Sequence, residues 1–578
     1  MTTAPTDSIL AADIGSITAR VALFDIVSGE FRFVASGEAR STVEPPFSYM
    51  GEGLHQAMEH LKILTGRTFM DDNDRLIMPI RMDGSGIDAF AASASGGKPL
   101  RVALAGLMPN ISLASAERVA LSAHVIIVDR MGLGDRRKPE RQIDDLINAK
   151  PEVVIIAGGT DYGSQGAVLK LADMVAMAAR RMREGTRPEI LFVGNAALHE
   201  KVKDIFTGLC DVGVAENLRP ILDEENITSA RRQLARIYER VRLGTMAGYG
   251  ELSQWTTHGV TPNATAFGNL VHHMSQTTDS GKGLLAVDVG SASITLAAAI
   301  GGDISVTVRA DLGVGHSAAY LTPSIDRLSR WLPEAYPDDE VRDYIANKSL
   351  APATVPYELR ELFLEHALAR QCMQNVLQSA AWPAKLKGIP GLLPSFDTII
   401  GSGAVLARAP KPGQAALMLL DGLQPTGIVT LVLDSHSLMP LLGAASALNP
   451  VAVVQALDAG ALSVIGTAVC LVGDGHPGQE AVRVKATVGD QKIDRRISFG
   501  SLELIHLPPE RDVKVSIQPS GAFDAGFGRG ASKSITIQTG AVGLIVDARG
   551  RPIGIPTTAD ERHETVSKWC ANLGEYSS

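Results

Sequence analysis

A four-residue motif, an aspartate followed by any residue, glycine and serine, occurs twice in this chain, 275 positions apart. The first copy is Asp13-Ile14-Gly15-Ser16 and the second is Asp288-Val289-Gly290-Ser291. Each copy follows a short apolar run and leads into another, a pattern that predicts a strand, a tight turn and a second strand. Two copies in corresponding positions are a stronger signal than either copy alone.

The residue types in this motif suit a nucleotide phosphate tail and its Mg²⁺. Glycine lets the main chain approach the phosphates, backbone N–H groups and the serine hydroxyl donate to phosphate oxygens, and aspartate holds the metal or its water shell. Two such turns facing each other predict a clamp that grips phosphates from both sides. The alternative interpretation is a pair of ordinary glycine-containing hairpin turns.

The bulk composition describes a globular chain of several domains. Its 578 residues predict roughly three to five domains, and 45% hydrophobic with 20% charged residues excludes a disordered protein. The formal net charge of −9 argues against broad binding to nucleic acid or to an anionic membrane, because both need a positive field.

Cysteine spacing and apolar runs predict a cytoplasmic location. The four cysteines contain no Cys-x-x-Cys pair, so neither a zinc ribbon nor a disulfide scaffold is indicated. The segment from Met1 to Ser8 lacks the pattern of a signal peptide. The longest apolar run, residues 461–472, falls short of the ~20 residues that span a bilayer.

A third glycine-rich turn, Gly401-Ser402-Gly403, follows the two aspartate motifs along the chain. It lies between an apolar strand-like run and a helix start. Because glycine removes the side-chain obstruction, this backbone is suited to pass close to a purine or ribose. Many strand–helix turns share the pattern, so its value comes from its order after two phosphate-type turns.

The order of these three loops resembles the actin, hexokinase and Hsp70-type ATPase superfamily. A closer match is the glutamate mutase L family, also called MutL or GlmL, which is unrelated to the DNA mismatch-repair protein of similar name. The resemblance covers nearly the whole chain and is carried by residues 12–21, 154–161, 311–316 and 543–552. The third of these stretches reads Asp311-Leu312-Gly313-Val314-Gly315-His316.

The resemblance implies an α/β fold with two duplicated ribonuclease H-like lobes, an inserted Rossmann- or flavodoxin-like unit and a β-rich C-terminal domain. We expect the first lobe to begin in residues 1–100, an inserted or continuing parallel-sheet unit in 101–215, a helical connection in 216–283, the second lobe in 284–461, and the β-rich domain with a terminal helix in 462–578. Apolar runs alternating with helical segments support the parallel sheet. Residues 83–98, rich in glycine, serine and alanine, are expected to form a loop or a close backbone contact.

The resemblance also implies a site for ATP with Mg²⁺. Asp13 and Asp288 would hold the metal's water shell from opposite sides. The phosphates would be received by Gly15, Ser16, Thr18, Gly290, Ser291 and Ser293, and the adenosine by Gly401, Ser402 and Gly403. Asp311 and Asp434 are candidates to orient the attacking water, although each is equally suited to cap a strand end or a helix.

Members of the family act beside adenosylcobalamin-dependent mutases, and the resemblance implies an ATP-driven reactivating factor with mutase subunits as partners. No nucleic acid or membrane partner is expected, and an oligomer is compatible with the sequence. Ile17 and Ala292 stand where a hydroxyl would assist phosphate binding, which favours slow turnover. The alternatives are an actin-like scaffold or filament, a pseudo-ATPase that only binds partners, and a small-molecule kinase.

Overall fold

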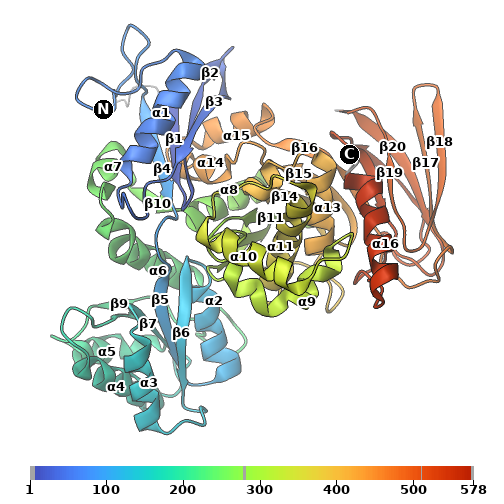
Figure 1. The fold of residues 1–578 in the computed structure, drawn as a ribbon. Helices are drawn as coiled ribbons and strands as arrows, with labels where there is room; N and C mark the ends of the chain where they lie inside the picture. Colours follow the sequence, from blue (N-terminus) through green and yellow to red (C-terminus); the bar gives the residue numbers. More distant parts are fainter. Residues whose placement is uncertain (1–6, 278–280, 384, 510, 575–578) are drawn as a thin grey trace.

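The structure, a computed structural model, describes residues 7–277, 281–383, 385–509 and 511–574, and the expected mixed α/β class is confirmed. The prediction that there is no signal peptide rests on residues 1–8, and most of these lie outside the described residues. The described residues form four sheets. Figure 1 shows helices packed against them, except that the C-terminal sheet extends outward at one side of the molecule. Within the described residues, no helix is both long and apolar enough to cross a membrane.

The first sheet has the strand order β10-β4-β1-β2-β3. Its strands are β1 (Ser8–Ile14), β2 (Thr18–Val27), β3 (Glu30–Arg40), β4 (Ala89–Ala94) and β10 (Val260–Pro262). β2 is antiparallel to β1 and β3, whereas β4 and β10 run parallel to β1. β4 lies within residues 83–98. Of the two expectations for this segment, the loop is wrong for six residues, whose backbone instead packs closely against β1 as a strand.

Alternate residues of β1 pack on opposite faces of the first sheet. Leu10 and Ala12 belong to the core that includes α1 (Gly51–Thr65), and Ile9 and Ala11 belong to the core that includes α8 (Asn263–Thr277) and α14 (Met439–Ala445). This alternation is the period of a strand covered on both sides. The ends of β1 and its turn are therefore held by packing on both faces.

The predicted parallel sheet is present and is formed by the part of the chain that follows β4 and precedes β10 in the sequence. Its strands are β5 (Leu100–Gly106), β6 (Val125–Gly132), β7 (Val153–Ala157), β8 (Glu189–Phe192) and β9 (Val212–Val214), in the order β6-β5-β7-β8-β9. Its helices are α2 (Ala114–Ala120), α3 (Pro139–Ala149), α4 (Gly166–Arg181), α5 (His199–Phe206) and α6 (Thr228–Val241). This is the flavodoxin-like order, with helices on both faces.

The second large sheet has eight strands in the order β13-β12-β11-β14-β15-β16-β22-β19. They are β11 (Gly283–Val289), β12 (Ile294–Ile300), β13 (Asp303–Arg309), β14 (Phe396–Ser402), β15 (Gly427–Leu433), β16 (Ser463–Cys470), β19 (Leu502–Ile505) and β22 (Gly543–Asp547). The first five strands along the chain repeat the order and the directions of the first sheet. The two sheets are therefore topological copies of one another over these strands.

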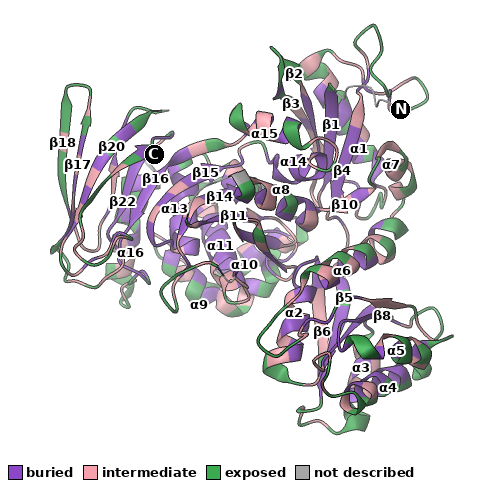
Figure 2. Cartoon of the chain, turned by 180° about the vertical axis from the view of Figure 1, so that it is seen from behind, coloured by how far each residue is buried: buried purple, intermediate pink, exposed green. Residues whose placement is uncertain are grey.

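Helices cover both faces of this sheet. On one face lie α10 (Asp338–Leu350), α11 (Leu359–Leu377) and α13 (Pro412–Leu423); α8, α14 and α15 (Pro450–Asp458) share a core with both large sheets. Shorter helical elements are α7 (Tyr249–Trp255), α9 (Ile325–Leu328), α12 (Ala404–Ala407), 3₁₀ turns at Ala196–Leu198, Leu243–Thr245, Ala318–Ser324 and Ser329–Trp331, and π-helical segments at Pro109–Leu113 and Cys570–Gly574. Figure 2 shows the two large sheets buried beneath these helices.

The C-terminal part of the chain, expected to be rich in β-structure, contains a separate four-stranded sheet. β17 (Glu480–Val488), β18 (Gln491–Ser498), β20 (Asp512–Pro519) and β21 (Lys533–Gln538) form an antiparallel sheet in the order β18-β17-β20-β21. It shares a core with β16 and β22 of the eight-stranded sheet, and the fully buried Phe523 belongs to this core. The chain ends its described part on α16 (Ala559–Trp569) and the π-helical segment.

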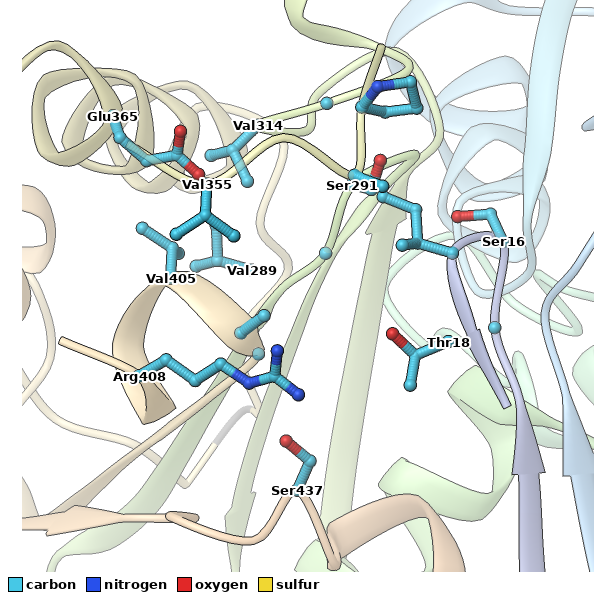
Figure 3. Close-up of a pocket in the computed structure, with 18 of the residues that line it drawn as sticks. Ser16, Thr18, Val289, Ser291, Val314, Val355, Glu365, Val405, Arg408 and Ser437 are labelled. Atoms are coloured by element: carbon cyan, nitrogen blue, oxygen red, sulfur yellow. The ribbon is translucent and has the colours of Figure 1, made fainter. Parts of the chain in front are cut away.

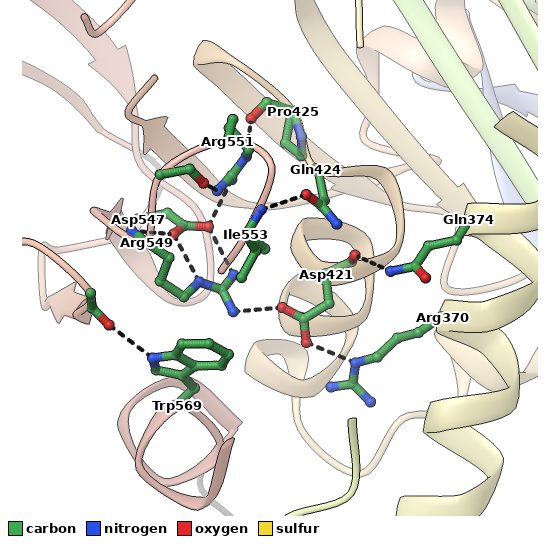
Figure 4. Close-up of polar contacts among 12 residues, drawn as sticks. Arg370, Gln374, Asp421, Gln424, Pro425, Asp547, Arg549, Arg551, Ile553 and Trp569 are labelled. Atoms are coloured by element: carbon green, nitrogen blue, oxygen red, sulfur yellow. Dashed lines mark hydrogen bonds and ion pairs between the residues drawn. The ribbon is translucent and has the colours of Figure 1, made fainter. Parts of the chain in front are cut away.

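A buried ion network joins the C-terminal strand β22 to helices α11 and α13 (Figure 4). Asp547 accepts hydrogen bonds from Arg549 and Arg551 at 2.8 Å, Arg549 Nη1 donates to Asp421 at 2.7 Å, and Arg370 Nε donates to the other oxygen of Asp421 at 2.8 Å. No side chain in the network is more than 4% exposed. Because each charge is paired, the network holds β22 and its loop to the helical face.

Candidate functional site

The two aspartate motifs form equivalent turns. In the first, the Gly15 N–H donates to the Thr18 carbonyl at 3.0 Å; in the second, the Gly290 N–H donates to the Ser293 carbonyl at 3.0 Å. A Cβ on these glycines would lie 3.1 and 2.9 Å from the same carbonyl oxygens. A side chain at either position would crowd this oxygen, so glycine suits each turn, and the predicted strand–turn–strand units are confirmed.

Both turns open onto one cavity of about 510 Å³ between the two large sheets (Figure 3). Of the residues singled out in the sequence, the structure brings the following to its lining: Asp13, Gly15, Ser16, Thr18, Asp288, Gly290, Ser291, Ser293, Ser402 and Gly403. Asp311, Gly401 and Asp434 are not part of that lining. The cavity therefore gathers residues that lie almost 400 positions apart in the sequence.

The third glycine-rich turn contributes its last two residues to the cavity. Gly403 has φ +96°, and a Cβ there would lie 2.3 Å from the Val289 carbonyl oxygen, so only glycine lets this turn lie against the end of β11. Gly401 faces the interior instead, where a Cβ would meet Leu406 and Leu419 at 3.1–3.2 Å.

The two aspartates predicted to orient water have structural partners in this structure. Asp434 accepts the backbone N–H groups of Leu438 and Met439 at 2.6 and 3.0 Å, and so caps the start of α14. It also accepts the Ser402 hydroxyl at 2.8 Å. Asp311 forms a two-point ion pair with Arg309, with contacts of 2.7 and 2.6 Å.

The carboxylates of Asp13 and Asp288 line the cavity, and that of Asp434 lies behind the lining, near enough to repel Asp288. Asp13 accepts hydrogen bonds from Ser93 at 2.6 Å and from Asn263 at 2.9 Å, yet burial outweighs them and raises its pKa. Burial, followed by repulsion from Asp13 and Asp434, raises the pKa of Asp288 to about 7. A cavity edge that gathers negative charge in this way favours a cation.

The donor set suits Mg²⁺ bound through its waters. Within the described residues, no three His, Cys, Asp or Glu side chains stand close enough together to hold a metal ion by themselves. Mg²⁺ usually keeps several waters and takes its other ligands from one or two carboxylates and from phosphate oxygens. Asp13 and Asp288, one from each turn, fit that arrangement.

The high pKa of Asp288 predicts a pH-dependent effect of Asp288→Asn on stability without nucleotide or Mg²⁺. A carboxyl whose pKa is higher in the folded than in the unfolded state favours folding at low pH, and this contribution is lost as pH rises from about 4 through about 7. We therefore expect equal melting temperatures at about pH 4 and a more stable variant at pH 8. The gain in the free energy of unfolding at pH 8 is at most about 4 kcal/mol, and solvent in the cavity reduces it. Thermal melts at both pH values measure it, and an equal difference at both would contradict the raised pKa.

Several lining residues were not found from the sequence. Arg20 and Arg408 come from opposite sides of the cavity and both pair with Glu38, Arg20 at 2.8 Å, so that these charges link the first sheet to the segment after α12. Arg20 lies two positions beyond Thr18, within residues 12–21, which carry the family resemblance. That position was the one sign in the sequence that Arg20 belongs to the site. Asn263, the first residue of α8, had none.

One end of the cavity is apolar and is lined by α11, α12 and the loop before α11. Figure 3 shows Val355 and Val405 beside Glu365 at this end, away from Ser16 and Thr18. Glu365 is buried and bonded to the Lys348 ammonium at 2.8 Å and to the Tyr344 hydroxyl at 2.7 Å. An apolar end with a few fixed polar groups is the usual lining of a small-molecule site.

Comparisons with known proteins give one family. The family model described as MutL protein matches residues 9–460. A curated relative, "Protein MutL" of Clostridium tetanomorphum, is 23% identical over 354 residues, which cover 56% of this chain and 73% of that protein.

Similar solved structures include acetone carboxylase in its nucleotide-free form, with a TM-score of 0.30 at 11% identity over 86% of this chain and 81% of that one. Component A of (R)-2-hydroxyglutaryl-CoA dehydratase from Acidaminococcus fermentans has a TM-score of 0.24 at 8% identity over 76% of this chain and 96% of that one. These likenesses are partial, and the fold rests on the sheet order described above.

Proposed function

Since the chain belongs to the MutL protein family, we propose that it binds ATP with Mg²⁺ between its two large sheets and hydrolyses it slowly. The observation that carries this proposal is the pair of equivalent glycine turns that open onto one cavity. The repeated strand order supports two ribonuclease H-like lobes of the actin-like type. Proteins of that type hold a nucleotide between their lobes and close around it.

The nucleotide would lie with its phosphates at the paired turns and its base at the apolar end. The Gly15 and Gly290 N–H groups are engaged inside the turns, so phosphate contacts fall to Ser16 and Ser291, with Thr18 and Ser293 beside them. Gly403 and Val405, which line the cavity, would contact the adenosine. Mg²⁺ would be held by Asp13 and Asp288 through water and would neutralise phosphate charge.

We assign the orientation of the attacking water to Asp13 rather than to Asp311 or Asp434. Ser93 and Asn263 fix the Asp13 carboxylate at the cavity edge, whereas Asp311 and Asp434 are engaged by Arg309 and by the start of α14. Positioning and charge neutralisation supply most of the rate in phosphoryl transfer. Ile17 and Ala292 remove hydroxyls from the turns, so we expect turnover to be slow.

The proposed task of this ATPase is to reactivate an adenosylcobalamin-dependent mutase of the glutamate mutase type. Family membership supports it, and nucleotide-driven closure of two lobes would supply the movement. The test is to add the protein to an inactivated mutase with fresh adenosylcobalamin and either ATP or ADP. Mutase activity is expected to recover with ATP but not with ADP. If this protein hydrolyses ATP and the mutase still does not recover, the proposed task is contradicted.

Asp13→Ala and Asp288→Ala are each expected to weaken MgATP binding by about 10–100-fold, because each removes a carboxylate that orients the metal's water shell. Titration calorimetry with ATP and Mg²⁺ measures the affinity. Asp173→Ala, which removes an exposed carboxylate on α4, is the matched control and should bind like the wild type. Unchanged affinity in both cavity variants would refute the assignment of the site.

A further inference from the structure

A serine, a histidine and a glutamate form a hydrogen-bonded chain at the edge of the cavity. The Ser291 hydroxyl lies 3.0 Å from His316 Nδ1, and His316 Nε2 lies 3.1 Å from a carboxylate oxygen of Glu44. Glu44 belongs to the segment after β3, whereas Ser291 and His316 belong to the second lobe. The histidine thus links the second phosphate turn to the first lobe.

The backbone around Ser291 fixes the direction of its hydroxyl. The backbone N–H of His316 donates to Ser291 Oγ at 3.0 Å. The hydroxyl hydrogen of Ser291 is therefore left to point at the ring nitrogen Nδ1 of His316. Gly315 permits this packing, because a Cβ there would lie 2.2 Å from Ser291 Oγ. Donation from Nε2 to Glu44 requires the hydrogen on Nε2, which leaves Nδ1 as the acceptor.

A hydroxyl bonded to an imidazole, itself oriented by a carboxylate, is the arrangement of an activated nucleophile. Ser291 also lines the cavity, on the turn that faces Ser16 (Figure 3). The electrophile that belongs at this turn, if the proposed function holds, is the terminal phosphoryl group of ATP. His316, which follows the lining residues Val314 and Gly315, then has a chemical role.

We propose that Ser291 is a phosphoryl acceptor, so that the protein phosphorylates itself at the second turn. Ser291 Oγ forms a bond to the γ-phosphorus, the bond from that phosphorus to the β,γ-bridging oxygen breaks, and ADP leaves with the bonding electron pair. The hydroxyl proton passes to His316 Nδ1 and then to solvent, which reaches His316 and Glu44 because their side chains are 27% and 38% exposed. His316 is the general base, and Glu44 is a positioning residue.

The test uses the full chain with Mg²⁺ and ATP labelled on the γ-phosphate, at about pH 8, above the ordinary range of imidazole titration. We expect covalent label that survives acid and is released by base, as a serine phosphate is, and that maps to Ser291. ATP labelled on the α-phosphate should give no covalent label. Label on His316 or on another residue would overturn the inference.

Three variants assign the roles at nucleotide concentrations that saturate each one. Ser291→Ala should lose the label, and His316→Gln should label about 100-fold more slowly because it lacks the base. Glu44→Gln keeps an acceptor for Nε2 without the charge, so we expect a roughly tenfold lower labelling rate with an unchanged half-saturating ATP concentration. A purely structural Glu44 would change that concentration as well.

The two proposals fail in distinguishable ways. A wild-type protein that binds MgATP in the calorimeter but takes up no covalent label refutes the phosphoryl-acceptor role and leaves the nucleotide site intact. A wild-type protein that binds no nucleotide refutes the proposed function, and the acceptor role with it. Labelling of Ser291→Ala to the wild-type level would refute the acceptor role even if ATP is bound and hydrolysed.

Discussion

Asp547→Ala is expected to destabilise the protein by about 3–5 kcal/mol, because it leaves two buried guanidinium groups without their shared carboxylate. Arg549 and Arg551 both donate to Asp547, and none of the three side chains is exposed. Burial opposes the charged form of Asp547, but the two arginines overcome it and hold its pKa well below the ordinary range. In the variant this compensation is lost, and Arg549 keeps one carboxylate partner, Asp421, besides its contact with the Trp569 ring.

Thermal unfolding followed by circular dichroism measures this effect, and a fall in melting temperature of about 10 °C is expected. Asp494→Ala is the matched control: Asp494 also forms a two-point ion pair, with Arg483, but on an exposed edge of the C-terminal sheet. The control should melt like the wild type, because exposed pairs contribute little. Equal melting temperatures for both variants would show that the buried network contributes no more than a surface pair.

Gly443→Ala is expected to cost about 3 kcal/mol, although alanine is the better helix former. α14 crosses α8 so closely that a Cβ at Gly443 would lie 1.9 Å from the Ala266 carbonyl oxygen and 2.5 Å from its carbon. Both contacts are with backbone, so a rotamer change cannot relieve them and the helices must separate. The clash therefore outweighs the gain in helix propensity, which is below about 1 kcal/mol.

Separation of these helices should also disturb the cavity. α8 begins at Asn263, which bonds Asp13, and α14 begins next to Asp434, which bonds Ser402. We expect MgATP affinity to fall at least about tenfold together with the melting temperature, as loss of one charged hydrogen bond would produce. Gly250→Ala in α7 is the matched control, since a Cβ there meets no atom within 4 Å. A variant at Gly443 that melts and binds like this control would contradict the close crossing.

The sequence predicted the two turns because their geometry is local. Each turn is closed by a hydrogen bond between residues three positions apart, from Gly15 to Thr18 and from Gly290 to Ser293. Apolar runs on both sides supply the strands that pair directly across the turn. Strand, turn and pairing partner thus lie within about twenty residues, and the residue pattern is sufficient to predict them.

The strand β4 could not be predicted in this way. Its sequence, Ala-Phe-Ala-Ala-Ser-Ala, is poor in the β-branched residues that favour strands and lies beside glycine-rich segments. It is a strand because β1 and β10 pair with it on either side and α14 packs against it. Small side chains suit that close packing, but they carry little strand preference of their own.

The roles of Asp311 and Asp434 show the same limit. Both occur near strand ends and before helical segments, where an aspartate suits either a catalytic or a capping position. Their partners are Arg309, two residues away, and the backbone at the start of α14. Which of the two positions each aspartate occupies depends on the direction of its side chain relative to the cavity, and residue spacing does not contain that direction.

Short stretches of sequence were enough to predict the paired glycine turns, the third glycine turn and the parallel sheet, because these follow from hydrogen bonds and side-chain periods over few residues. The folded chain alone established that Asn263 and Ser93 hold Asp13 and that Glu44 reaches His316 from the segment after β3. Those contacts join residues about 80 to 270 positions apart. They exist because the helices between the two sheets bring the turns together, and packing of that kind is set by the whole chain rather than by any one stretch.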